Sequence, residues 1–178
     1  FRSGGLEPRL GDHHIRTLTI TGFPSMTFPG HLDELNRLAF PYRWSTRAIM
    51  LDKTDATKLL TRIRRQWFAK RKSVAAILKE VMTNEASVLV DSDAANKAAD
   101  ADLALQELGA DTAGIAYVTT TICVWDRDAA LAAEKLRLVE KVIQGRDFTC
   151  TVEGVNAVEA WLGSLPGHVY ANVRQPPI

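Results

Sequence analysis

The chain has 178 residues, of which 46% are hydrophobic and 24% are charged, as in a soluble globular protein. This composition excludes a largely disordered chain, and the two cysteines, Cys123 and Cys150, are too few for a disulfide scaffold. Twenty-two basic and 21 acidic side chains leave a net charge of +1, so the overall charge favours no class of partner.

The first 50 residues predict two strands separated by a short helix. Threonines alternate with Leu18 and Ile20, a pattern typical of a half-buried strand over 17–21. Leucines at a helical spacing predict a short helix over about 31–39. A second alternating segment, 42–50, predicts a strand that leads directly into a helix.

The middle of the chain carries two helix-period segments of opposite charge. No acidic residue lies between Asp55 and Glu80, whereas the stretch from Glu80 to Asp111 has Lys97 as its only basic residue. We expect a basic helix over about 56–83 and an acidic, alanine-rich helix over about 94–108. Small alanines and opposite charges favour antiparallel pairing, so residues 56–108 predict a helical hairpin, with Trp67 buried in it or against the sheet.

The remaining chain predicts two more strands and two more helices. A β-branched and aromatic run over 115–125 predicts a central strand, and 148–152 alternates as a last strand. Between them, Asp126 or Asp128 caps a helix that runs to about 143. The expected inner face of this helix contains Leu131, Leu136, Val139, Val142 and Ile143.

A last helix and a tail complete the expected elements. Asn156 and Glu159 have the spacing of a capping box at the start of the helix, which ends before Pro166. Prolines and a glycine then predict an extended tail over 166–178.

This order of elements predicts an α+β fold. We expect a ferredoxin-like split βαβ unit, with four antiparallel strands, helices on one face and the long helical hairpin 56–108 inserted. A three-layer parallel α/β sheet is the alternative, but the chain has too few continuous apolar strands for it. We interpret residues 1–178 as a single domain, and the start at Phe1 rather than Met indicates a piece of a longer protein.

The sequence contains no recognisable catalytic motif. It lacks the phosphate-binding G-x-x-x-x-G-K-[ST] loop, the G-x-G-x-x-G turn and the G-x-S-x-G elbow. Asp12, His13 and His14 are adjacent, but neighbouring side chains on an extended chain point to opposite faces, which disfavours a metal site. We therefore predict no catalytic residue, cofactor site or metal site in this chain.

The basic helix carries the one candidate interaction surface. Its cations and aromatics alternate as they do on surfaces that bind nucleic acid or anionic lipid. The alternative is a solvated helix face neutralised by the acidic helix, and the nearness of the acidic block favours it. The candidate residues are Arg64, Arg65, Trp67, Phe68, Lys70, Arg71 and Lys72.

Several stretches together resemble a known family. They are Asp52–Leu60, Arg64–Lys72, Asn96–Asp102, Tyr117–Thr121, Asn156–Leu162 and Pro166–Pro176. In these stretches, and in collinear order over nearly the whole chain, the sequence resembles the CagE/TrbE/VirB family of type IV secretion ATPases. None of the stretches is a catalytic signature.

The resemblance implies a role without catalysis for this portion of the protein. Members have an N-terminal region followed by a RecA-like motor with Walker motifs, which binds ATP and Mg. The chain is similar to the later portion of the N-terminal region, with 166–178 leading toward the motor. The family implies bacterial oligomers, commonly hexamers, at the cytoplasmic face of the inner membrane, which power pilus assembly and DNA transfer.

Two functions remain open at this point. The resemblance implies assembly with other subunits of the same ATPase and docking to inner-membrane channel components. The alternative is a nucleic-acid-binding domain that uses the basic helix over 58–79. A strong salt dependence of DNA affinity would distinguish them, because phosphate neutralisation releases counterions.

Overall fold

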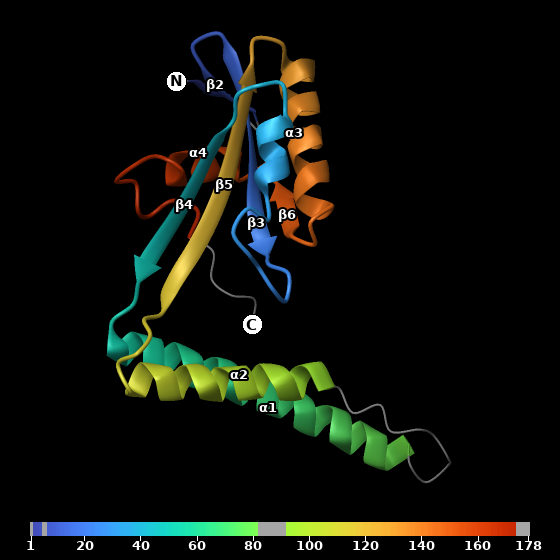
Figure 1. Ribbon diagram of the computed structural model, residues 1–178, viewed down its shortest axis with the longest axis vertical. Helices are drawn as coiled ribbons and strands as arrows, with labels where there is room; N and C mark the ends of the chain where they lie inside the picture. The colour runs from blue at the N-terminus through green and yellow to red at the C-terminus, as the bar shows by residue number, and fades with distance from the viewer. Residues whose placement is uncertain (1, 5–6, 82–91, 174–178) are drawn as a thin grey trace. The chain divides into compact units, whose positions relative to one another are not determined.

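The computed structural model describes residues 2–4, 7–81 and 92–173 (Figure 1). Two compact units emerge from the backbone contacts. The sheet unit combines Phe1–Ile49 with Tyr117–Gln175, and the hairpin unit is Met50–Ala116. Each unit is described by itself below.

The sheet unit is built around one long central strand, β3 (His13–Gly22). Strand β5 (Ala116–Asp126) pairs antiparallel along one edge of β3, with Leu18 opposite Ile122. Two short strands, β2 (Glu7–Leu10) and β6 (Thr149–Val152), pair antiparallel with different parts of the other edge. The sheet is completed by β1 (Arg2–Gly4) beside β2 and by β4 (Arg43–Met50) beside β5. The expected α+β fold with an antiparallel sheet is confirmed.

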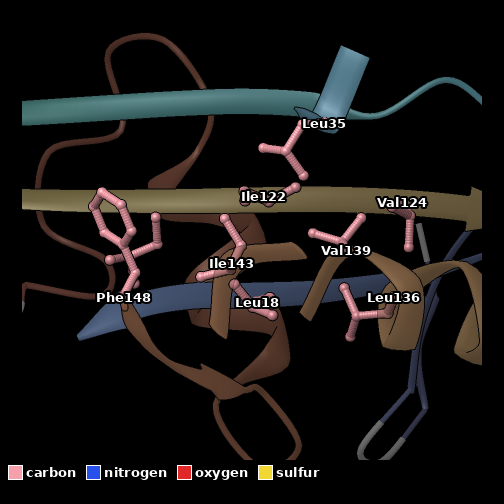
Figure 2. Close-up of a cluster of buried hydrophobic side chains, with 9 residues drawn as sticks. Leu18, Leu35, Ile122, Val124, Leu136, Val139, Ile143 and Phe148 are labelled. Carbon is pink, nitrogen blue, oxygen red and sulfur yellow. The ribbon is translucent and has the colours of Figure 1, made fainter. Parts of the chain in front are cut away.

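The apolar core lies on one face of this sheet. The helix α3 (Ala129–Gln144) and the 3-10 helix η1 (Asp33–Arg37) cover side chains from β3 and β5, as Figure 2 shows. Between 31 and 39, a single short 3-10 turn forms where a helix was expected. The buried cluster contains Leu18, Ile20, Leu35, Ile122, Val124, Leu136, Val139, Ile143 and Phe148.

The opposite face of the sheet is also covered, contrary to the expectation of helices on one face. Thr17 and Thr19 are both 0% exposed, so β3 is buried on both faces rather than on one. The short helix α4 (Ala157–Gly163) lies on this side, because Ser164 at its end contacts Cys123, which alternates with the core residue Ile122. Threonine is small and β-branched, so it packs in a buried strand as well as at a solvated one.

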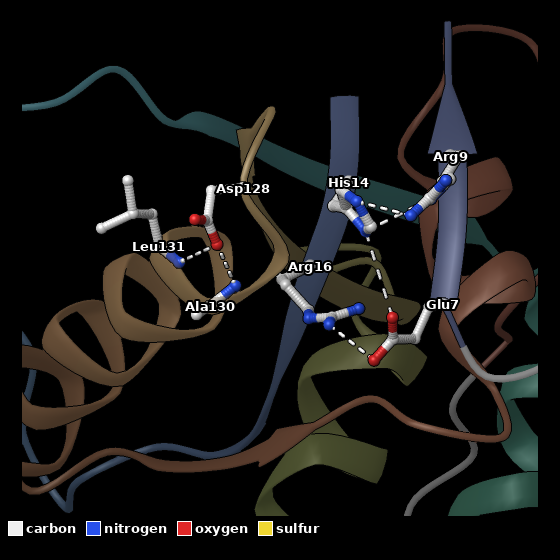
Figure 3. Close-up of polar contacts among 7 residues, drawn as sticks. All are labelled: Glu7, Arg9, His14, Arg16, Asp128, Ala130 and Leu131. Carbon is white, nitrogen blue, oxygen red and sulfur yellow. Dashed lines mark hydrogen bonds and ion pairs between the residues drawn. The ribbon is translucent and has the colours of Figure 1, made fainter. Parts of the chain in front are cut away.

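The helix caps differ in part from the sequence predictions. Asp128 is the cap of α3 and accepts hydrogen bonds from the backbone N–H groups of Ala130 at 2.7 Å and Leu131 at 3.3 Å (Figure 3). The expected inner position of Leu131 is wrong, since this side chain is 54% exposed. At α4, Asn156 makes no capping hydrogen bond. Its amide instead donates to Glu153 and to Asn172.

The strands β1 and β2 were not expected from the sequence. Gly11, at φ +62°, turns the chain between β2 and β3. Across this pair, Arg9 Nη2 lies 2.7 Å from Nε2 of the buried His14, and Arg16 donates to Glu7 at 2.7 Å (Figure 3). His14 therefore has an arginine as its partner, and the described residues contain no cluster of three or more side chains that could hold a metal ion.

The hairpin unit consists of α1 (Lys53–Val81) and α2 (Ser92–Gly109), within three residues of the predicted bounds. Lys53 Nζ lies 2.7 Å from Asp111, whereas Arg64 lies 2.8 Å from Asp102, so the helices run antiparallel. The expected connection over 84–93 lies mostly outside the described residues. Neither helix, over its described length, is long and apolar enough to cross a membrane.

A small apolar cluster holds the base of the hairpin together. Ala56 and Leu60 of α1 are buried against Leu108 of α2. Partly buried side chains surround them, namely Leu51, Ala104, Leu105 and Ile115. Further along α2, Ala98 and Ala101 are buried, as the expected close approach of an alanine-rich helix requires.

Candidate functional site

The inner face of α1 takes two of the predicted interaction residues. Arg64 Nη1 donates to Asp102 Oδ1 at 2.8 Å, and each of the two side chains is 41% exposed. Trp67 is partly buried, and Lys97 Nζ of α2 lies 4.5 Å from the centre of its ring. Trp67 is thus less buried than expected. Arg64 and Trp67 are residues of the contact between the two helices, not of a free surface.

The outer basic face of α1 consists of Lys58, Arg62 and Arg65, which are all exposed. A shallow hollow of about 490 Å³ follows these residues along the helix. Lys58 pairs with Asp55 on the same helix at 3.1 Å. Within the portion of the chain that the structure describes, neither Arg62 nor Arg65 has a carboxylate within ion-pair distance.

The predicted set of seven residues therefore does not form one surface. Arg65 and the 36% exposed Phe68 lie outside the contact with α2, whereas Arg64 and Trp67 lie within it. Lys70, Arg71 and Lys72 lie on the described backbone of α1, but their side chains are outside the described portion.

An outer acidic face lies on α2. Asp100, Leu103 and Glu107 are exposed and follow one another at steps of three and four residues, so they share one side of the helix. Leu103 is 55% exposed and places an apolar side chain between the two carboxylates. The hairpin unit thus carries a basic outer face on one helix and an acidic outer face on the other.

Sequence analysis missed a second polar site, on the sheet unit. Arg47 of β4 donates from Nη1 to the carbonyl oxygens of Ala171 at 2.6 Å and His168 at 3.1 Å, and from Nη2 to that of Asn172 at 2.8 Å. Nη1 also lies 3.4 Å from the carbonyl oxygen of Gly163. Burial lowers the pKa of the Arg47 guanidinium, and the carbonyl oxygens offset this cost of removing the charge from water. We call this arrangement the tail clasp.

Asn172 completes the tail clasp. It adopts φ +50°, a left-handed conformation that asparagine tolerates better than most residues. Its side-chain amide donates to Thr19 Oγ1 at 3.3 Å and its Oδ1 accepts from Asn156 at 2.9 Å. The described segment of the tail, 166–173, is therefore folded back by turns rather than extended, and 174–178 lies outside the described residues.

The comparisons with known proteins identify the family. A family model described as "CagE, TrbE, VirB family, component of type IV transporter system" matches residues 41–174. The chain belongs to this family. The resemblance inferred from the sequence is confirmed, and the matched range runs from the start of β4 through the hairpin unit to the tail clasp.

Two relatives of this family align with almost the whole chain. A probable conjugal transfer protein TrbE of Sinorhizobium fredii (strain NBRC 101917 / NGR234) is 33% identical over 174 residues, which cover 98% of this chain and 26% of the relative. The conjugal transfer protein TrbE of Rhizobium radiobacter is 32% identical over 174 residues, 98% of this chain and 21% of the relative. The chain thus spans about a quarter and a fifth of the length of these relatives.

The contact between Arg64 and Asp102 predicts a difference between two neighbouring arginines. Arg64→Glu should lower the free energy of unfolding by up to about 1 kcal/mol, because it places two carboxylates across the helices at a half-exposed position. Arg65→Glu should change it by less than about 0.5 kcal/mol, since Arg65 has no such contact. Urea denaturation of both variants measures the difference, and Asp102→Arg should restore the stability of Arg64→Glu. Equal losses in both variants, or no rescue, would contradict the assignment.

Proposed function

We propose that this chain is a non-catalytic assembly and docking domain of a type IV secretion or conjugal transfer ATPase. Membership of the CagE/TrbE/VirB family supports a part in conjugal transfer, and the sequence contains no phosphate-binding loop. ATP and Mg are assigned to a motor outside this chain. In this proposal the parent protein works in the bacterial cytoplasm, at the cytoplasmic face of the inner membrane, and contacts channel components there.

The proposal extends to the fold. The strand order β6-β3-β5-β4 is compatible with a ferredoxin-like split βαβ unit, with η1 in the place of the first helix. The hairpin unit is then an insertion between β4 and β5. An insertion that has its own apolar cluster can present a surface without disturbing the sheet.

The observation that carries the proposal is the pair of outer faces on the hairpin unit. Arg62 and Arg65 on α1, and Asp100 and Glu107 on α2, are exposed charges of opposite sign. Because the two faces belong to different helices, the basic face of one subunit can pack against the acidic face of the next. Such charge complementarity sets the register and orientation of an interface more than its affinity. The partner is another subunit of the same ATPase.

Reversing the basic outer face tests this role. In the full-length parent protein, Arg62→Glu with Arg65→Glu should lower the fraction of assembled subunits in sedimentation velocity, because like charges then meet at the interface. The matched control is Arg37→Glu with Lys141→Glu, which reverses two exposed charges of the sheet unit. Normal assembly of the first variant, with the helical content retained, would reject the proposal.

A nucleic-acid interface is the second candidate, and the exposed Arg62 and Arg65 favour it. If the three cations of the outer basic face bind phosphates, the plot of log affinity against log salt should have a slope of about −2.7, at −0.9 for each neutralised phosphate. Intact assembly combined with lost DNA binding in the Arg62→Glu, Arg65→Glu variant would select this function over assembly.

A further inference from the structure

A pocket of about 370 Å³ lies in the sheet unit, on the face that carries α4. Its volume is within the range of pockets that hold small molecules. Two tryptophans, Trp125 of β5 and Trp161 of α4, supply large aromatic surfaces to the lining. Apolar side chains make up most of the rest, namely Leu10, Ile15 and Leu165.

One cation lines this apolar pocket. Arg43 of β4 donates from Nη2 to the Ser164 hydroxyl and lies 3.6 Å from the Cys123 sulfur. Both partners are neutral, because burial raises the pKa of the Cys123 thiol and keeps it protonated. The Arg43 Nε is buried and has no hydrogen-bond partner in the described structure.

The pocket contains no compensating carboxylate among the described residues. Asp12, next to the lining residue His13, already contacts His13 Nδ1 at 2.8 Å and Arg127 Nε at 2.9 Å. The guanidinium of Arg43 therefore brings one positive charge to a mostly apolar site. A charge in such surroundings gains most from an anionic partner that also brings apolar surface.

We propose that this pocket binds a small planar aromatic monocarboxylate. The carboxylate pairs with the Arg43 guanidinium, and the flat apolar body packs against the indole rings of Trp125 and Trp161. A neutral ligand leaves the guanidinium without a counter-charge, and a dianion brings more negative charge than the single arginine offsets. The site lies within the sheet unit and does not depend on the assembly role of the hairpin unit.

Calorimetric titration of the 178-residue chain with 2-naphthoate and with the isosteric, neutral 2-naphthamide tests the proposal. The acid should bind at least about tenfold more tightly than the amide, the effect of one charge-assisted hydrogen bond. Arg43→Met should remove this preference, whereas Arg43→Lys should retain part of it. Arg37→Met is the matched control, because Arg37 is exposed and does not line the pocket.

The wild-type comparison needs no variant, so it stands even where Arg43→Met fails to fold. Absence of saturable naphthoate binding at millimolar concentration overturns the proposal. Equal affinity for the acid and the amide overturns it as well, and so does an unchanged preference for the acid in folded Arg43→Met. Loss of the preference in Arg43→Met alone, with Arg37→Met unchanged, supports it.

Discussion

Leu136→Ala should lower the free energy of unfolding by about 2–5 kcal/mol, the usual cost of a large cavity in a packed core. Leu136 is 2% exposed and lies on α3 in the cluster that Figure 2 shows, close to Val124 and Val139. Removing its side chain takes away apolar contacts between α3 and the sheet that no neighbour replaces. Urea denaturation followed by circular dichroism measures the loss.

Leu131 provides the matched control on the same helix. Leu131→Ala should cost less than about 1 kcal/mol, because this leucine is already 54% exposed in the folded chain. Both substitutions remove the same atoms from α3, so helix propensity changes equally in the two variants. Equal losses from the two would mean that α3 packs with a different face from the one described.

Arg47→Met should open the tail clasp. Methionine keeps much of the apolar side chain but leaves the carbonyl oxygens of Ala171 and Asn172 without their donor. We expect a loss of about 2–4 kcal/mol, as for several hydrogen bonds to a charged group that are lost together. Hydrogen exchange of the amides in 163–173 should accelerate more than exchange in α3.

The exposed Arg37 is again the control, and Arg37→Met should change the stability by less than about 0.5 kcal/mol. Exchange rates of 163–173 that stay at the wild-type value in Arg47→Met would show that other contacts, such as those of Asn172 with Thr19, hold the segment without the arginine.

Periodicity was sufficient to predict the long elements. The helices α1 and α2 repeat their apolar positions over several turns, and β5 is β-branched almost throughout, so local patterns specify them. The strands β1 and β2 are short and carry arginines and a proline, so they have no alternating pattern to detect. Their pairing comes from the turn at Gly11 and from contacts across it.

The sequence also did not reveal the tail clasp. Arg43 and Arg47 alternate with apolar residues, which is typical of a strand with one solvated face. Their actual partners are carbonyl and hydroxyl groups more than 100 residues further along the chain, and no local pattern encodes such contacts. Two arginines on one side of a strand, opposite a row of threonines, are the only sequence signal for this covered polar face.

The candidate surface was predicted as a block, although helical phase divides it. Arg64 follows Leu60 by four residues and Trp67 follows it by seven, so both belong to the side that packs against α2. Arg65 is offset from this side and belongs to the outer basic face. Charge segregation alone identifies the hairpin as the feature of interest, and the phase of the helix is needed to separate its internal contact from its outer surface.

A charge-swap mixture of full-length proteins is the most direct measurement of assembly through the hairpin. One variant carries Arg62→Glu and Arg65→Glu, and the other carries Asp100→Lys and Glu107→Lys. Each alone presents like charges on both outer faces and should remain unassembled in sedimentation velocity, whereas an equimolar mixture should regain assemblies of wild-type size. Two folded variants that assemble separately, or a mixture that stays unassembled, would contradict an interface between the basic and acidic outer faces.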